Sequence, residues 1–271
     1  MLSSDNIEKM SDHTERFTGR AEDYDRYRQR YPVDTILDRL RSWTGLTPAW
    51  RIADIGAGTG MLSEVFLANG NAVIAIEPNA DMRRFMQTRL APTHRTAQLR
   101  IIEGTAEATT LPDRSVELVG VGRALHWFDR NRAIAEFRRI LVPRGWVAVV
   151  ALDRRRDADD PEMKHQVAAF DQVIANAGTD YSKVRARYGT YERIDEWFGD
   201  GEMHQAEIHG TRELDWDSFR GHTLSLSTAP RVDAPNFAEF EKAMRSYFDA
   251  HARAGILTIP VTCWIAAARL P

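Results

Sequence analysis

Cysteine is almost absent from this chain of 271 residues, which contains a single one, Cys263. A disulfide framework within one copy is therefore excluded, and no cysteine pair or cysteine–histidine spacing typical of zinc sites occurs. The eight histidines are scattered along the sequence. We therefore expect no metal site.

A strong charge of one sign and a long apolar run are also lacking. The 36 lysines and arginines nearly balance 39 aspartates and glutamates, which gives a formal net charge of -3. This balance provides no general attraction to nucleic acid or to an anionic membrane. No apolar run approaches the ~20 residues of a membrane-spanning helix, and the first residues lack the apolar core of a secretion signal. We expect a cytoplasmic protein, a monomer or homodimer, that binds neither nucleic acid nor membrane.

Short apolar runs alternate with amphipathic ones from Arg51 onward, in a strand–helix–strand order. Seven strands are predicted: Arg51–Ile55, Ala72–Ile76, Leu99–Glu103, Val116–Val121, Trp146–Leu152, Met203–His209 and Ile256–Ala267. Helices are expected between the first five, among them Gly60–Ala68, Ala80–Leu90 and Arg130–Leu141. This alternation predicts an α/β fold with a mostly parallel sheet and helices on both faces.

The pattern changes after Leu152. Four further helices are expected, over Pro161–Asn176, Lys183–Trp197, Trp216–Leu226 and Asn236–Ala252. We predict one domain, divided into N-terminal lid helices (1–45), a ligand-binding core (46–152), a helical cap inserted as 153–202 and 211–253, and the last strands (203–210 and 254–271).

The most informative stretch is RIADIGAGTGMLSEVF, which begins at Arg51. It places three glycines, Gly56, Gly58 and Gly60, between a strand and a helix. Glycines allow positive φ and close approach of a ligand to the backbone, and a helix N-terminus offers free N–H groups to an anion. The stretch therefore predicts a nucleotide-type binding loop.

Two familiar loops do not fit this stretch. The dinucleotide fingerprint G-x-G-x-x-G would need a third glycine where Met61 stands. A phosphate-binding Walker loop would need a Gly-Lys-Ser/Thr sequence, which is absent.

The run Asp54-Ile55-Gly56-Ala57-Gly58-Thr59-Gly60 resembles the first motif of the class I S-adenosylmethionine-dependent methyltransferases. The resemblance extends over roughly Phe17–Leu152. It implies a Rossmann-like, seven-stranded sheet whose last strand is antiparallel, with S-adenosylmethionine as the cofactor and S-adenosylhomocysteine as its product. Of this motif, it assigns Asp54, Gly56, Ala57, Gly58 and Gly60 to cofactor binding.

Three later motifs agree with this resemblance. Glu77 ends the second predicted strand, where the family has the acid that accepts the ribose hydroxyls, and a carboxylate there suits either a dinucleotide or adenosylmethionine. Pro78 and Met82 resemble residues that flank the adenine. The stretch Thr105-Ala106-Glu107 resembles the segment that binds the adenine edge.

After the fourth strand, Arg123-Ala124-Leu125-His126-Trp127-Phe128-Asp129 resembles a stretch of small-molecule methyltransferases related to the trans-aconitate and ubiquinone/menaquinone enzymes. It implies that Arg123 and Ala124 border the cofactor. Because the carboxyl end of a strand faces the ligand crevice in an open α/β sheet, His126 is expected near the cofactor or substrate.

The segment before the core also resembles this subgroup, in which it folds over the cofactor. Tyr24, Arg28, Tyr31 and Pro32 match its pattern, whereas Gln29 stands where the subgroup usually has proline. The resemblance adds Tyr24 and Arg28 to the cofactor-binding residues, and Tyr24 also to the catalytic candidates.

Methyl transfer from a sulfonium requires few catalytic groups, because it is an in-line displacement that depends mainly on positioning. His126 is the candidate base for a hydroxyl or amine acceptor, with a pocket wall as its alternative role. A carboxylate acceptor would need a cation instead of a base, and Arg123 or Arg154–Arg156 could supply one.

We predict methyl transfer to a small organic molecule. The alternatives are a nucleic-acid or protein methyltransferase and a protein that binds S-adenosylmethionine without catalysis. A nicotinamide-dependent dehydrogenase is disfavoured by Met61. The Asn/Asp-Pro-Pro-aromatic motif of base-methylating enzymes is absent after the fourth strand, where the chain reads ALHWFD.

Overall fold

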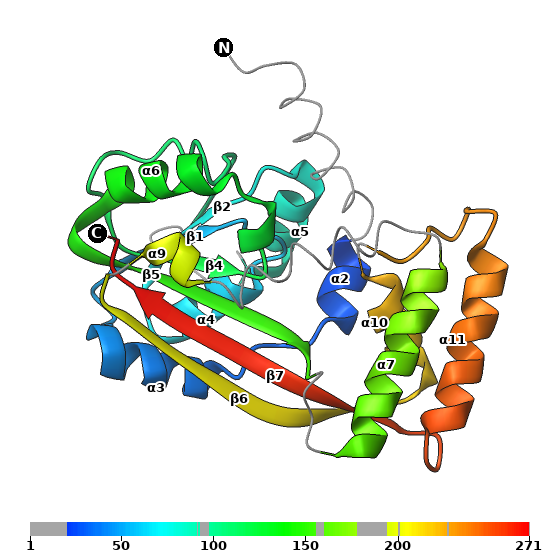
Figure 1. Ribbon diagram of the computed structural model, residues 1–271. Helices are drawn as coiled ribbons and strands as arrows, with labels where there is room; N and C mark the ends of the chain where they lie inside the picture. The colour runs from blue at the N-terminus through cyan, green and yellow to red at the C-terminus, as the bar shows by residue number, and fades with distance from the viewer. Residues whose placement is uncertain are drawn as a thin grey trace.

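Seven strands form one sheet in this computed structural model, which describes residues 21–90, 92, 98–155, 160–177, 194–199, 201–226 and 228–270. Their order across the sheet is β3-β2-β1-β4-β5-β7-β6 (Figure 1). The bounds are Arg51–Ile55 (β1), Ala72–Ile76 (β2), Leu99–Ile102 (β3), Val116–Gly122 (β4), Leu141–Arg154 (β5), Met203–Leu214 (β6) and Leu257–Ala268 (β7). Strands β1 to β5 are parallel to one another, whereas β7 is antiparallel to both β5 and β6. The predicted fold class, including the antiparallel last strand, is confirmed.

Helices cover both faces of this sheet. One face packs against α3 (Val33–Thr44), α4 (Met61–Ala68) and α5 (Ala80–Leu90), whose apolar side chains meet strand residues such as Ile52 and Leu118. The other face packs against α6 (Arg130–Ile140) and α9 (Asp195–Phe198). The central strands read as continuous apolar runs because they are buried on both sides.

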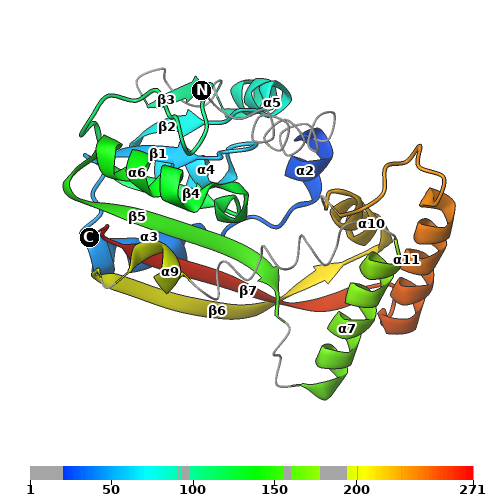
Figure 2. The ribbon, with the colours of Figure 1, turned by 45° about the horizontal axis from the view of Figure 1, so that its top comes forward.

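A third core lies away from the sheet centre. Helices α7 (Pro161–Asn176), α10 (Trp216–Leu224) and α11 (Phe237–His251) gather at the far end of the β6–β7 ribbon (Figure 2). Their aromatic side chains Phe170, Phe219, Tyr247 and Phe248 are all buried there. The ring centroids of Phe219 and Tyr247 lie 5.6 Å apart, so these aromatics form the core of the cap.

Strand β6 is longer at the cap end than expected. The sequence predicts β6 to end at His209, but its pairing with β7 continues to Leu214 opposite Leu257. Side chains along β6 are mostly polar, so an apolar pattern does not mark this extension.

Strand β5 also begins five residues early, at Leu141, where a register shift separates it from the main ladder with β4. The expected helix Lys183–Trp197 lies largely outside the described residues, which include only its end in α9.

The first described helix, α2 (Ala21–Tyr27), packs against α10 of the cap (Figure 1). A Cβ at Gly221 would lie 2.4 Å from the ring of Tyr27, so only glycine permits this approach. Arg212 of β6 donates from Nη2 to the carbonyl of Tyr27 over 2.8 Å. The N-terminal segment is therefore attached to the cap as well as to the core.

Glycine is also required in the middle of β4. A Cβ at Gly120 would lie 2.8 Å from the ring of Phe66, which is fully buried in α4. We predict that Gly120→Ala lowers the free energy of unfolding by about 1–3 kcal/mol, because it overpacks this layer. Urea denaturation measures the change.

Gly210→Ala is the matched control, since Gly210 is also in a strand but has space around it. The nearest atom to a Cβ added at Gly210, Cγ2 of Val261, would be 4.0 Å away. We expect the effect of this substitution to stay within about 0.5 kcal/mol. Equal effects of the two substitutions would show that close packing of α4 on β4 is not what requires Gly120.

Candidate functional site

The glycine loop lies at the carboxyl ends of β1 and β2. Gly56, Gly58 and Gly60 have φ values of 67°, 57° and 85°, in the left-handed region that glycine adopts most readily. The amides of Gly56 and Ala57 both donate to the carbonyl of Ile76, the last residue of β2. These two bonds fix the loop to the end of the neighbouring strand.

A carboxylate holds the loop from the other side. Glu77 follows β2 and is 7% exposed. Its Oε2 accepts from the amide of Gly58 over 2.8 Å, and its Oε1 accepts from the amide of Asn79 over 2.8 Å. Burial raises the pKa of Glu77, while these two amides and the Arg83 guanidinium act in the opposite direction.

A cavity of about 150 Å³ opens beside this carboxylate. Its wall combines the glycine loop, the segment after β2, the turn after β3 and the segment after β4. All four follow the carboxyl ends of parallel strands, where open α/β sheets bind their ligands. The lining residues are Tyr24, Gly56, Gly58, Glu77, Pro78, Asn79, Met82, Thr105, Ala106, Glu107, Gly122, Arg123, Ala124, Trp127 and Phe128.

Most of the residues predicted from sequence meet in this wall. Gly58 is one of them, and no atom lies within 4 Å of the position of a Cβ there, so a ligand can approach its backbone closely. The predicted cofactor residues that line the cavity are Tyr24, Gly56, Gly58, Glu77, Pro78, Met82, Thr105, Ala106, Glu107, Arg123 and Ala124.

The other four predicted cofactor residues lie outside the lining. Asp54 is fully buried and Ala57 is 9% exposed. A Cβ at Gly60 would lie 2.7 Å from Leu90, so this glycine permits the packing of α5. Arg28 lies over the ring of Tyr24, with Cζ 4.8 Å from the ring centroid.

His126 is also outside the lining. It belongs to a short 3-10 helix, η1 (Leu125–Trp127), and is 8% exposed. Its ring lies 4.7 Å from that of Trp127, which does line the cavity. This position suits the wall interpretation of His126 better than the base interpretation.

Four lining residues were not among the predicted cofactor residues: Asn79, Gly122, Trp127 and Phe128. Asn79 carried a signal, because asparagine just before a helix is a favoured cap, and its Oδ1 accepts from the amide of Met82. Trp127 and Phe128 directly follow the predicted His126, so the same motif contained them.

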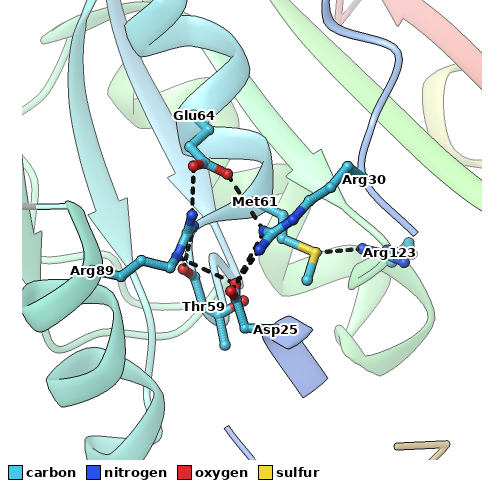
Figure 3. Close-up of polar contacts among 7 residues, drawn as sticks. All are labelled: Asp25, Arg30, Thr59, Met61, Glu64, Arg89 and Arg123. Atoms are coloured by element: carbon cyan, nitrogen blue, oxygen red, sulfur yellow. Dashed lines mark hydrogen bonds and ion pairs between the residues drawn. The ribbon is translucent and has the colours of Figure 1, made fainter. Parts of the chain in front are cut away.

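Helix α2 is fixed next to the loop by a charge network (Figure 3). Asp25 of α2 is 6% exposed and accepts two hydrogen bonds from Arg30, over 3.0 and 2.6 Å. Arg89 of α5 forms ion pairs with Asp25 and with Glu64 of α4. The network thereby positions Tyr24, the neighbour of Asp25, on a cavity whose other lining residues belong to the strand ends of the sheet and the segments that follow them.

Arg123 connects the loop region with the N-terminal segment. Its Nη2 lies 2.9 Å from the sulfur of Met61 (Figure 3). Its Cζ lies 5.0 Å from the ring centroid of Tyr31 and 5.9 Å from that of Tyr24. Its φ is 55°, an uncommon value for a residue with a side chain. Such strained positions concentrate at functional sites.

No three histidine, cysteine, aspartate or glutamate side chains are grouped as a metal site in the described ranges. The same ranges contain no helix with the length and apolar character needed to cross a membrane.

Asp54 is the second buried acid at the loop. Its Oδ2 accepts from the hydroxyl of Ser63 over 2.6 Å, whereas its Oδ1 has no hydrogen-bond partner among the described residues. Burial raises the pKa of Asp54 to about 7, with a further contribution from Glu77. A cation bound beside these acids would favour their ionised forms.

The raised pKa of Asp54 predicts a dependence of stability on pH. In the unfolded chain this carboxyl titrates near ~4, so between about pH 4 and 7 the folded chain holds a proton that the unfolded chain has lost. The contribution of Asp54 to stability is therefore greatest below pH ~4 and is lost as the pH rises to about 7. We predict that Asp54→Asn reduces the difference in unfolding free energy between pH 5 and pH 8 by on the order of 2 kcal/mol.

Urea denaturation at the two pH values measures this difference. Asp38→Asn is the control, because Asp38 is an exposed carboxylate on α3. If Asp54→Asn and Asp38→Asn change the pH dependence equally, Asp54 does not titrate as a buried acid.

Residues 53–149 match a family model described as a methyltransferase domain. An uncharacterised methyltransferase of Mycobacterium tuberculosis is 38% identical over 127 residues, which are 47% of this chain and 48% of that protein. An uncharacterised methyltransferase of Schizosaccharomyces pombe is 30% identical over 129 residues, 47% of this chain and 49% of that protein. These matches span about half the length of the curated relatives.

A solved structure described as a type II methyltransferase from Anaeromyxobacter dehalogenans has a TM-score of 0.62 with this chain. It is 24% identical, and the match covers 90% of this chain and 99% of that one, which shows the shared fold. Residues 53–149 are therefore similar in sequence to methyltransferase domains, and the chain shares its fold with a solved structure described as a methyltransferase.

Proposed function

We propose that this chain transfers a methyl group from S-adenosylmethionine to a small organic molecule. The observation that carries the proposal is the buried Glu77 carboxylate, which accepts from the Gly58 amide at the edge of a cavity formed by four strand ends. The match of residues 53–149 to a methyltransferase domain supports it.

The residues around the cavity fit this cofactor. Glu77 has acceptor capacity left for ribose hydroxyls, since each of its oxygens accepts one backbone amide. The apolar side chains of Pro78, Met82 and Ala106 offer faces for an adenine ring. Behind the loop, Asp54 is a second buried acid, and a cationic ligand would favour its ionised form.

Bound S-adenosylmethionine would supply a methyl carbon already activated by a sulfonium. The chain then has to hold the acceptor in line with that carbon and exclude water, and such positioning can contribute about 7–11 kcal/mol. Tyr24, Trp127 and Phe128 line the cavity and can enclose the acceptor. The accepting atom forms a bond to the methyl carbon while the carbon–sulfur bond breaks and its electron pair goes to sulfur.

The balanced charge favours a small acceptor over nucleic acid. An incubation with methyl-labelled S-adenosylmethionine tests this choice, with a panel of small organic acids, phenols and amines against bulk RNA, DNA and protein. Label in a small-molecule product supports the proposal. Label in a macromolecule, or none in any acceptor, contradicts it.

Glu77 provides a direct test of the cofactor site. We predict that Glu77→Ala weakens S-adenosylmethionine binding more than tenfold, because a hydrogen bond to a charged group contributes ~1.5–3 kcal/mol. Titration calorimetry measures the affinity. Glu77→Gln retains one acceptor oxygen and is the second variant should the alanine variant unfold.

Glu103→Ala is the matched control, because Glu103 also follows a strand end but is exposed and paired with Arg83. We expect its affinity within twofold of the wild type. An unchanged affinity of both Glu77 variants would remove Glu77 from the cofactor site.

Substitution of His126 separates the two roles left open by the sequence. If His126 is a wall residue behind Trp127, His126→Ala changes cofactor affinity little and lowers turnover less than tenfold, which is the result we expect. If His126 were a general base, its loss would instead lower the rate of methyl transfer by ~10²–10⁴-fold. Single-turnover assays decide, and a loss above a hundredfold with intact cofactor binding would make His126 the base.

A further inference from the structure

Three arginines converge between α2, β6 and the segment after β4, next to the cavity. Arg28 and Arg123 lie near the ring of Tyr24, with Cζ atoms 4.8 and 5.9 Å from its centroid. Arg212 comes from β6 and is bonded to the backbone of Tyr27. It lies close enough to Arg28 and Arg123 for their charges to lower its pKa, in addition to the larger effect of its burial.

Two of these arginines have no acidic partner among the described residues. Arg28 donates from Nη2 to the carbonyl of Ser225 over 3.1 Å, and its buried Nε has no hydrogen-bond partner among the described residues. Arg212 contacts the carbonyl of Tyr27 and Nδ1 of His222. In the part of the chain that the structure describes, neither arginine forms an ion pair with a carboxylate.

The neighbouring titratable groups do not supply the missing negative charge. Burial, opposed by Arg123, raises the pKa of Tyr31 to about 12, so this phenol stays neutral. Burial and the surrounding guanidiniums hold the pKa of His222 well below its ordinary value. Neutral His222 can accept the hydrogen bond from Arg212, which explains the contact between them.

The nearby acids are engaged elsewhere. Asp25 is paired with two other arginines, and Glu77 accepts from two backbone amides of the cavity wall. Arg28 and Arg212 therefore repel each other, and no carboxylate of the described ranges compensates their charges. Partly buried cations in this situation are costly unless an anion compensates them.

We propose that Arg28 and Arg212, with Arg123 at the cavity edge, bind a carboxylate of the methyl acceptor, so that the substrate is a small organic acid. The planar fork of arginine matches a carboxylate in a bidentate manner. The inference rests on the proposed function, because it names the acceptor class of that same site. Tyr24 connects the two regions, since it lines the cavity and contacts both Arg28 and Arg123.

Titration calorimetry of the full chain saturated with S-adenosylhomocysteine tests the proposal. The probes are succinate, citrate and benzoate, with neutral succinamide and inorganic phosphate for comparison. We expect at least one carboxylate to bind tenfold or more tightly than succinamide and phosphate. We further expect Arg28→Gln and Arg212→Gln to weaken carboxylate binding at least tenfold, with the S-adenosylhomocysteine affinity of the Arg212→Gln variant within twofold of the wild type.

Two other kinds of substitution complete the design. Arg28→Lys and Arg212→Lys keep the positive charge but remove the planar guanidinium that allows bidentate hydrogen bonding. Each should give a carboxylate affinity between those of the wild type and the glutamine variant. Arg138→Gln removes an exposed arginine of α6 and should have no effect.

The outcomes distinguish this inference from the proposed function. Three outcomes would overturn the acceptor class without affecting the cofactor site. S-adenosylhomocysteine could bind while none of the carboxylates binds, or phosphate could bind more tightly than the carboxylates. Carboxylate binding could also be unaffected by the Arg28 and Arg212 variants. Failure of S-adenosylhomocysteine itself to bind would overturn the proposed function.

Discussion

The hydrogen bond from the Gly58 amide to the Glu77 carboxylate is the contact on which the site depends. It joins the ends of two parallel strands and places an acid beside a backbone without side chains. Two amides of the loop donate to Ile76 and complete the attachment. The sheet, its two helical layers and the turn after β3 bring these few groups to one edge.

Charge is distributed unevenly around this edge. Two buried acids, Asp54 and Glu77, lie at the glycine loop, and burial raises the pKa of each. Arg28, Arg123 and Arg212 gather instead around the N-terminal segment that carries Tyr24. The acids suit a cationic methyl donor, and the arginines suit an anionic acceptor. Each half of the proposed site is therefore electrostatically complementary to its own ligand.

Local patterns in the sequence were sufficient to predict the strands of the sheet and many of the residues that line the cavity. The DIGAGTG loop, Glu77 and the Thr105–Glu107 turn each follow a strand, and the ends of parallel strands meet at one edge. Prediction was weaker where structure depends on distant contacts. Arg212 and Tyr27 are 185 residues apart, and neither lies in a pattern that predicts their contact. The extension of β6 is mostly polar, so only its pairing with β7 reveals it.

A crystal structure of the chain with S-adenosylhomocysteine is the most direct test of the central claim, that this cavity binds the methyl donor. The account predicts the ribose hydroxyls within hydrogen-bond distance of the Glu77 carboxylate and the adenine beside Pro78, Met82 and Ala106. A ligand bound elsewhere, or a cavity that takes NAD in preference to S-adenosylhomocysteine, would contradict it.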